Sequence, residues 1–200
     1  MEYLPASLGV STQRGSMDKI SIIVDSWIVQ DGNYGDFASG DSARFALAFL
    51  GNTLRPGASA NMLARHLGKG MYEVCAQVLF VNSEVWVIDF GLCAFWEATP
   101  PEFAKPGTWV EGVISVGIDP YFYMEYLHEV TGMPDLFYNW HVASIMRNDT
   151  PWLVEVNTHG ATSLARDETR ETWSSVTRTN AWNDDEGRSS YVLALERREV

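Results

Sequence analysis

The feature that most constrains the fold is an alternation of apolar and polar residues with a period of two. Side chains of a β-strand point alternately to opposite faces, so this alternation indicates strands with one buried face. It is clear in residues 44–49, 72–80, 110–118, 136–143 and 191–195. Residues 20–29 are apolar on both faces for part of their length, which is typical of a covered strand. We therefore expect a mainly β protein of about ten strands.

Two short helices are predicted between the strands. Residues 59–67 are one of them, because Ser59 or Asn61 can cap the first turn and Gly68 follows where a helix-terminating glycine belongs. Residues 120–130 follow Asp119, whose carboxylate can cap the amides of a first helical turn, and Pro120 suits the first helical position. The second segment also fits a period of two, so a strand is the alternative there.

The order of these elements suggests a barrel. Over residues 71–158 the chain reads strand, strand, strand, helix, strand, strand, which is the order of the OB-fold, a small five-stranded barrel. Residues 183–187, Asn-Asp-Asp-Glu-Gly, have the composition of a hairpin turn between two strand-like segments. We expect a single antiparallel barrel or sandwich, with one or two short helices and a C-terminal hairpin.

Two stretches carry a resemblance to known proteins. Residues 88–91 (Ile-Asp-Phe-Gly) and 107–112 (Gly-Thr-Trp-Val-Glu-Gly) have a spacing similar to that of OB-type barrels. Residues 27–37 resemble the opening of an uncharacterised bacterial family of all-β proteins with an OB-fold-like strand order. No activity attaches to that family, so the resemblance implies a fold and a bacterial origin, and no function.

Residues 1–16 are polar and show no periodicity, so they are predicted to be a disordered extension. Met17 directly precedes the first patterned segment and is a possible alternative start. Residues 17–200 are then expected to form a single β-rich domain. The longest apolar run, residues 45–50, is far shorter than the ~18 residues that indicate a membrane span, so no membrane association is expected.

The formal net charge is −12, and its distribution is more informative than its total. Residues 1–70 hold six acidic and six basic side chains, whereas residues 71–140 hold ten acidic side chains and one base, Lys105. Residues 141–200 hold ten acidic side chains and seven arginines. Binding to phosphates requires clustered Lys or Arg, so a nucleic-acid partner is not expected in the middle third. A solvated acidic surface that keeps the protein dispersed is the simplest interpretation.

The two cysteines, Cys75 and Cys93, lie in apolar, strand-like surroundings without a CxxC motif. Two buried, reduced thiols are the default for such a pair and favour a cytoplasmic protein. A disulfide between neighbouring strands is the alternative. Glycine-rich phosphate loops, nucleophile elbows and paired-cysteine zinc motifs are absent from the sequence, so no cofactor is expected.

The most enzyme-like cluster is Glu125, His128 and Glu129. On a continuous helix, side chains three or four positions apart share a face, so either carboxylate could hold His128 as a base or as a metal ligand. A zinc site would need a further ligand, such as His141. The alternative is a solvated helix face without catalytic work.

Asp31, Asn33, Asp36 and Asp41 form an oxygen-rich loop, and oxygen ligands are what calcium prefers. The spacing departs from the EF-hand pattern, because Asp36 stands where the turn glycine belongs. Local turn hydrogen bonds account for the same residue types, so this loop is only a weak metal candidate and no metal is expected.

Eight tryptophans are present. Four of them fall in predicted strands and are expected in the core, namely Trp27, Trp86, Trp140 and Trp152. Other aromatic rings lie beside carboxylates, a combination that favours recognition of a basic partner. The candidate partner-binding residues are Trp109, Glu111, Trp173, Trp182, Asp184 and Asp185. Packing of these rings on both faces of a sheet is the alternative.

These features favour a non-catalytic, soluble bacterial protein that binds a basic protein through its acidic middle third. An immunity protein or an inhibitor of a nuclease-like target would fit, because opposite potentials speed encounter and suppress wrong partners. Two alternatives stay open. One is a small metal-dependent enzyme that uses Glu125, His128 and Glu129. The other is an OB-type binder of single-stranded nucleic acid, which has fold analogy in its favour and charge against it.

Overall fold

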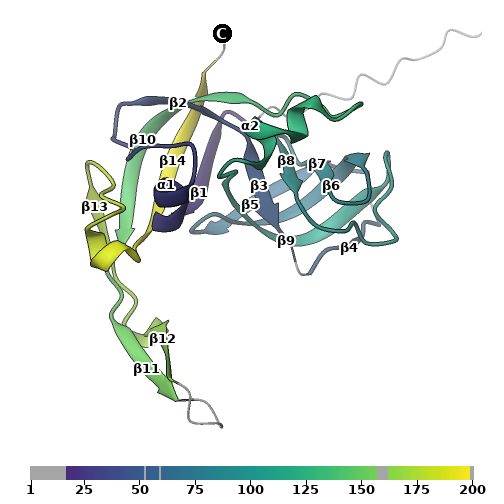
Figure 1. Ribbon diagram of the computed structural model, residues 1–200. Coiled ribbons are helices and arrows are strands. Elements are labelled where there is room, and N and C mark those ends of the chain that lie inside the picture. Colours follow the sequence, from purple (N-terminus) through teal and green to yellow (C-terminus); the bar gives the residue numbers. More distant parts are fainter. Residues whose placement is uncertain (1–16, 52, 59, 157–161, 199–200) are drawn as a thin grey trace, which may run out of the picture.

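The computed structural model describes residues 17–51, 53–58, 60–156 and 162–198 (Figure 1). The predicted extension over residues 1–16 lies outside the described residues. The strands are β1 (Lys19–Asp25), β2 (Ser42–Phe45), β3 (Leu47–Leu50), β4 (Arg55–Pro56), β5 (Leu63–Gly68), β6 (Met71–Val81), β7 (Trp86–Asp89), β8 (Cys93–Trp96), β9 (Trp109–Ile118), β10 (Tyr138–Asn148), β11 (Trp152–Val156), β12 (Thr162–Arg166), β13 (Trp173–Val176) and β14 (Ser190–Arg198). The helical segments are α1 (Ser26–Asp31), α2 (Phe122–Glu125) and the 3₁₀ turns η1 (Leu127–Glu129), η2 (Glu168–Arg170) and η3 (Asp184–Gly187).

The predicted fold class is confirmed: the protein is mainly β, with a closed five-stranded barrel and two short helices. The ring runs β3, β8, β7, β6, β9 and back to β3. The β3–β8 pair is parallel, and the other four pairs are antiparallel. Starting at β6, the ring order is β6, β7, β8, β3 and β9. If β3 is counted as the fifth strand, although it precedes the others in the chain, this is the strand order of an OB-type barrel.

Four of the five barrel strands, β6 to β9, lie within the predicted segment, residues 71–158, and the fifth does not. The fifth position of the barrel is taken by β3, which precedes the other four strands in the chain and fills the gap between β8 and β9. Because that gap is filled, β10 lies outside the ring and pairs with β14, β13 and β2 instead. The helix α2 accordingly follows the last barrel strand and does not separate the third from the fourth.

The predicted C-terminal turn forms as the short segment η3, but the strands on either side of it are not paired with each other. β10 lies between β13 and β14 in the sheet and pairs antiparallel with both. The C-terminal hairpin expected from the sequence is thus a three-stranded arrangement whose central strand comes from residues 138–148. A turn composition specifies a reversal of the chain and leaves the pairing partner open.

β9 joins the barrel to the open part of the sheet. Along one edge of β9, β6 is the pairing partner as far as Ser115. Beyond it, β1 pairs with the same edge through one parallel pair, between Ile23 and Gly117. The hairpin turn between β5 and β6 fills the gap between them. There the carbonyl of Gly70 accepts a hydrogen bond from Val116 N–H at 2.8 Å. Gly70 therefore marks the seam at which the barrel and the open sheet separate.

The strand predicted over residues 20–29 is wrong for its second half, because β1 ends at Asp25 and α1 follows. Ser26 ends the strand through long-range contacts: its N–H and its Oγ both donate to the carbonyl of Ser189 at 2.8 Å. α1 leaves the side chain of Trp27 45% exposed and not in the core. A Cβ at Gly32 would lie 2.1 Å from the carbonyl oxygen of Ile28, so the end of α1 requires glycine.

The helix predicted over residues 59–67 is also wrong, since residues 63–68 form β5 and pair antiparallel with β6. Gly68 does have the positive φ expected of it, 108°, but it leads into a hairpin turn in which Lys69 and Gly70 also have positive φ. Both helix ends and tight hairpins use such residues, so the glycine alone does not distinguish them.

The helix predicted over residues 120–130 forms in two parts, α2 and η1, which are separated at Tyr126 (φ −150°). The predicted cap is confirmed. Asp119 Oδ1 accepts from Phe122 N–H at 2.9 Å, and Oδ2 accepts from Tyr123 N–H at 2.8 Å. Tyr123 and Leu127 pack in a small apolar cluster with Val87 of the barrel wall. This cluster fixes α2 against the outside of the barrel.

The main core fills the barrel and continues under the open sheet. Trp86 and Trp140 are fully buried, as predicted. Trp86 lies 5.1 Å from Phe49 and 6.1 Å from Trp96 between ring centroids, so aromatic packing extends towards the barrel surface. Trp152, in contrast, is only partly buried, because β11 belongs to a separate two-stranded sheet that projects from the body as an arm (Figure 1).

The two cysteines lie on different barrel strands, Cys75 on β6 and Cys93 on β8. β7 lies between these strands in the ring. Neither cysteine forms a disulfide in the part of the chain that the structure describes.

Candidate functional site

The enzyme-like cluster does not assemble on one helix face, because the helix is interrupted between its members. Glu125 Oε1 accepts a hydrogen bond from Asn33 Nδ2 at 3.3 Å. His128 Nδ1 lies 2.9 Å from the carbonyl oxygen of Tyr123, and its Nε2 lies 3.9 Å from Glu129 Oε1. The imidazole is thus held by the backbone of its own turn, while the first carboxylate faces the loop after α1.

The members of the oxygen-rich loop point in different directions. Asp36 Oδ1 accepts from Thr179 Oγ1 at 2.8 Å and from Ala181 N–H at 2.9 Å, so it anchors the segment after β13. Asn33 donates to Glu125, and Asp31 is exposed at the end of α1. Within the described ranges, no group of three or more His, Cys, Asp or Glu side chains is placed to hold a metal ion.

The predicted partner-binding residues fall in two separate places. Trp109 and Glu111 lie on the same face of β9, and both are partly buried. Glu111 Oε1 accepts from Nε and Nη2 of Arg55, at 3.1 and 2.9 Å. The arginine of β4 therefore neutralises this carboxylate.

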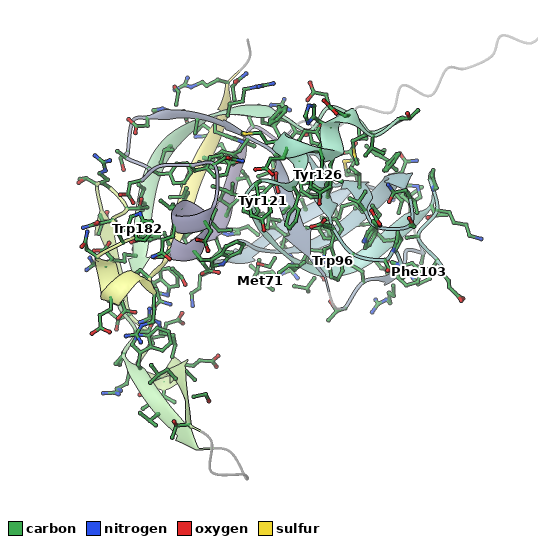
Figure 2. The ribbon with its side chains drawn as sticks, viewed as in Figure 1. Met71, Trp96, Phe103, Tyr121, Tyr126 and Trp182 are labelled. Carbon is green, nitrogen blue, oxygen red and sulfur yellow. The ribbon has the colours of Figure 1, made fainter. Side chains whose placement is uncertain are left out.

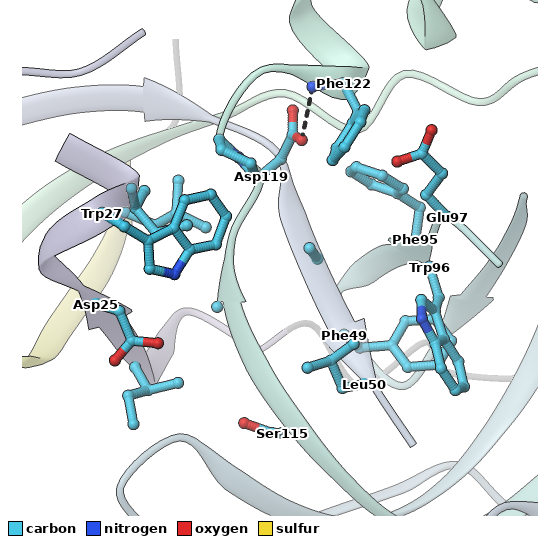
Figure 3. A pocket seen from close by; sticks show the side chains of 16 residues that line it. Asp25, Trp27, Phe49, Leu50, Phe95, Trp96, Glu97, Ser115, Asp119 and Phe122 are labelled. Atoms are coloured by element: carbon cyan, nitrogen blue, oxygen red, sulfur yellow. Dashed lines mark hydrogen bonds between the residues drawn. The ribbon is translucent and has the colours of Figure 1, made fainter. Parts of the chain in front are cut away.

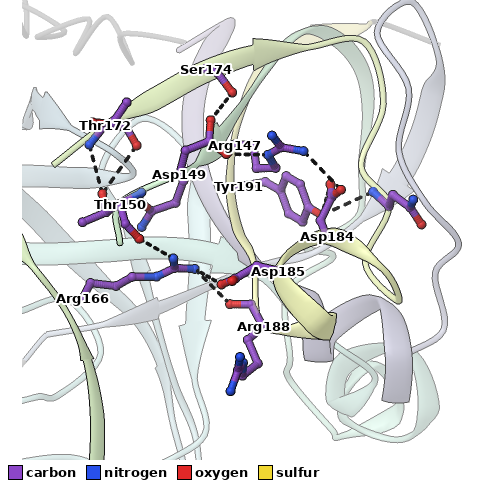
Figure 4. A network of polar contacts seen from close by, with 12 residues as sticks. Arg147, Asp149, Thr150, Arg166, Thr172, Ser174, Asp184, Asp185, Arg188 and Tyr191 are labelled. Carbon is purple, nitrogen blue, oxygen red and sulfur yellow. Dashed lines mark hydrogen bonds and ion pairs between the residues drawn. The ribbon is translucent and has the colours of Figure 1, made fainter. Parts of the chain in front are cut away.

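Of the other four predicted residues, Asp184 and Asp185 lie in η3, where the arm leaves the body (Figure 4). Trp173 begins β13, and Trp182 lies in the segment before η3. Asp185 Oδ2 accepts from Arg166 Nη2 at 2.6 Å and from Trp152 Nε1 at 2.7 Å. The guanidinium carbon of Arg166 lies 3.8 Å from the ring centre of Trp152. Asp184 Oδ1 pairs with Arg147 Nη1 at 3.2 Å. Both carboxylates bind arginines of the same chain, and Asp185 connects η3 to the two arm strands β11 and β12.

Removal of the Arg166 guanidinium is expected to loosen the arm. In Arg166→Ala, Asp185 loses a charged partner and the Trp152 ring loses its stacking contact, so amide exchange in residues 152–154 should accelerate roughly tenfold. Arg188→Ala is the control. Arg188 pairs with the exposed Glu186 and lies 5.5 Å from the same ring, so exchange should change little. Equal acceleration in both variants would contradict this assignment.

A cavity of about 250 Å³ opens between α1 and the barrel (Figure 3). Residues from four separate segments line it: the β1–α1 junction, β3, the end of β8, and the connection from β9 to α2. Aromatic and aliphatic side chains make most of the wall, with Trp27 on the α1 side and Trp96 and Phe122 on the barrel side. The acidic lining residues are Asp25, Glu97 and Asp119, and none of the sixteen lining residues is Lys, Arg or His.

The electrostatic environment of this cavity is strongly acidic. Burial raises the pKa of Asp119 to about 6, although hydrogen bonds from the backbone N–H groups of the α2 turn act in the opposite direction. Burial also raises the pKa of Tyr34 and of Tyr126, and the charge of Asp119 adds to both shifts. Tyr126 donates its hydroxyl to Glu97 Oε1, so its phenol stays neutral.

Reasoning from the sequence assigned none of these residues to a site: Asp119 is predicted only as a helix cap, and Trp27 only as a core residue. Asp25 and Trp27 lie in what is predicted as a continuous strand, and Glu97 follows β8 in a segment without a motif. The single signal available in the sequence is the acidic excess of residues 71–140. It indicates the character of the site and leaves its location open.

Among the described residues, none of the helices has the length and the apolar character needed to cross a lipid bilayer. Comparison of the chain with protein-family models, with curated proteins and with solved structures finds no match.

Proposed function

We propose that this protein binds a basic protein partner, in the manner of an immunity protein or inhibitor, through an acidic surface around α2. The observation that carries the proposal is the state of the acidic side chains in residues 71–140. Two of the ten, Glu73 and Glu111, pair with arginines. Within the described ranges, eight have no Lys or Arg within ion-pair distance: Glu84, Asp89, Glu97, Glu102, Asp119, Glu125, Glu129 and Asp135.

The C-terminal third shows the opposite pattern. Its acidic side chains are largely neutralised within the chain, by Arg147, Arg166, Arg170, Arg188, Lys19 and Lys69. Exposed ion pairs of this kind add little to stability, but they cancel the potential that would attract a partner. The uncompensated negative charge is therefore concentrated on the middle third.

Part of this charge gathers at one place, which we call the α2 acidic surface: the exposed Glu84, Glu97 and Glu125, together with the buried Asp119. Glu84, Glu97 and Asp119 all act on the hydroxyl of Tyr126 and raise its pKa. Large apolar side chains are exposed beside them, with Trp27 45%, Tyr126 42% and Leu50 61% accessible. Aromatic rings among carboxylates are the composition expected where a basic protein is recognised.

Tyr121, Tyr126 and Trp96 lie on the barrel side of the molecule, whereas Trp182 lies at the opposite end (Figure 2). Trp182 is exposed, but the carboxylates near it, Asp184 and Asp185, are paired with arginines. We therefore assign recognition to the α2 acidic surface and not to the C-terminal turn. Binding of single-stranded nucleic acid gains support from the ring order of the barrel alone, and the charge of the same region opposes it.

The test compares two variants with the same change in net charge. Glu84→Gln/Glu97→Gln/Glu125→Gln neutralises the α2 acidic surface, and Glu73→Gln/Glu111→Gln/Glu186→Gln neutralises three carboxylates that arginines already hold. The immobilised full chain is used to capture proteins from a lysate of the source cells. The captured protein is then purified, and its association rate with each variant is measured at low and high salt.

We expect a captured protein with a basic surface, whose association with the first variant is about tenfold slower at low salt. Association with the second variant should stay within about twofold of the original rate, because its substitutions leave the α2 acidic surface intact. Equal losses in the two variants, a salt-independent rate, or the capture of no basic protein would each overturn the proposal.

A further inference from the structure

We propose that the cavity between α1 and the barrel is a binding site for the guanidinium group of an arginine side chain, presented by the basic partner. This inference rests on the proposed function and assigns to its surface one specific contact. The ligand class follows from the lining of the cavity, its charge and its free hydrogen-bond acceptors.

The lining excludes anions and favours a flat cation. Three carboxylates and no basic side chain line the cavity. Trp27, Trp96 and Phe122 provide aromatic faces, and cations are attracted to such faces, arginine more often than lysine. A planar guanidinium can stack on a ring while its N–H groups point outwards in the ring plane, whereas an ammonium is a compact, strongly hydrated charge.

The carboxylates keep acceptor capacity for those N–H groups. Asp25 Oδ1 accepts from Ser190 Oγ at 2.6 Å, and Glu97 Oε1 accepts from the Tyr126 hydroxyl. Among the described residues, no donor contacts the second oxygen of either carboxylate. Asp119 is buried, and backbone N–H groups of the α2 turn donate to both of its oxygens, so it contributes charge to the cavity wall and the free acceptors are those of Asp25 and Glu97. Charge-assisted bonds from a guanidinium to carboxylates are about twice as strong as bonds between neutral groups.

The same combination of groups already holds an arginine of this chain elsewhere, and a second arginine makes the ring contact. The guanidinium of Arg166 stacks on Trp152 and donates to Asp185, and the Trp152 indole N–H donates to the same carboxylate. Arg44 lies 4.1 Å from the ring centre of Phe137. In the cavity beside α1 the ring and the carboxylates are present, and none of the lining residues is an arginine. A cation from another molecule is what completes the arrangement.

The position of the cavity suits a protein-borne side chain. Trp27 and Leu50 line it and are 45% and 61% exposed, so apolar surface surrounds its opening. Such surface is covered when a partner docks, and an arginine in a central, desolvated pocket is a frequent hot spot. The volume of about 250 Å³ accommodates one long side chain and not a folded element.

The test uses the purified full chain and three soluble probes: N-acetyl-arginine methylamide, the lysine analogue, and the neutral citrulline analogue of nearly the same shape. Binding is followed by NMR shifts of the indole N–H groups. We expect the arginine probe to saturate the protein with a dissociation constant on the order of 1 mM. The citrulline probe should bind at least about tenfold more weakly, because it lacks the charge, and the lysine probe should lie between the two.

Two matched variants locate the site. Trp27→Ala removes the aromatic ring on the α1 side of the cavity and should lower the affinity for the arginine probe about fivefold or more. Trp182→Ala removes an exposed tryptophan that does not line the cavity, and should leave the affinity unchanged. Glu97→Gln removes one negative charge and should lower the affinity for the arginine probe, while the affinity for the citrulline probe should not change. Circular dichroism of each variant checks that the fold is retained.

Equal affinity for arginine and citrulline, equal losses in Trp27→Ala and Trp182→Ala, or no saturation by about 10 mM arginine probe would overturn the inference. These failures are distinct from failure of the proposed function. If the captured partner binds Trp27→Ala normally but binds Glu84→Gln/Glu97→Gln/Glu125→Gln poorly, the proposed function stands and the arginine pocket is wrong. If the probe results hold and capture is insensitive to the α2 acidic surface, the pocket stands and the proposed function is wrong.

Discussion

Gly70→Ala is expected to destabilise the fold by about 3 kcal/mol or more. Gly70 has φ 75°, a conformation that side chains disfavour. Its added Cβ would also lie 2.7 Å from the backbone N of Ile23 and 2.9 Å from the backbone O of Val116. Both contacts are to backbone at the seam between barrel and open sheet, so neither neighbour can rotate away. Equilibrium unfolding in urea measures the loss.

Two glycines separate the causes of this effect. Gly107→Ala places a Cβ at φ 87° with no atom within 4 Å, so it reports the conformational cost alone, about 1–2 kcal/mol. Gly35→Ala has neither a positive φ nor a close atom, and should be neutral or slightly stabilising. If Gly70→Ala costs no more than Gly107→Ala, the close packing at the seam is not what requires glycine.

Asp119→Asn is expected to remove a large pH dependence of stability. The pKa of Asp119 is raised to about 6 in the native state, against 3.8 for an exposed aspartate. Between these values the native protein binds a proton that the unfolded chain has lost, so protonated Asp119 stabilises the fold. This contribution is complete below about pH 4, is lost as the pH rises through about 6, and amounts to roughly 3 kcal/mol. Asparagine does not titrate, so the variant lacks this decline.

The comparison must be made across pH, because asparagine also loses one of the two acceptors that cap α2. The unfolding free energy of the original protein minus that of Asp119→Asn should therefore fall by roughly 3 kcal/mol from pH 4 to pH 7. Asp149→Asn is a control of opposite sign. Hydrogen bonds from Ser174 and Arg147 lower the pKa of Asp149 despite its partial burial, so its contribution is lost as the pH falls. A pH-independent difference for Asp119→Asn would contradict the assignment.

Sequence patterns located the strands well wherever one face is buried. β6, β9 and β14 lie where the alternation predicts them, and Trp86 and Trp140 are in the core. The cap by Asp119 was also predictable, because its partners lie three and four residues away. These features depend on neighbours in sequence, and local composition encodes such neighbours directly.

The candidate site was much less accessible to such reasoning. Residues 20–29 contain both β1 and α1, and the change between them depends on Ser26 meeting the carbonyl of Ser189. The segment around Gly68 has the residues of a helix end and becomes a hairpin, because β6 offers a complete row of backbone partners. Glu125 and His128 match a helix spacing, but the helix breaks between them. In each case a contact distant in sequence overrides a local preference.

The amino-acid sequence is enough to establish that this protein is mainly β, that its strands have one buried face, and that its middle third carries an excess of acidic side chains. The tertiary structure alone decided that β3 completes the barrel, that α1 stands opposite α2, and that Asp25, Glu97 and Asp119 surround one cavity. The physical reason is that a strand's period specifies which face is apolar and not which edge it will pair with. Edge pairing brings the four segments of the cavity together, and with them its aromatic rings and its charge.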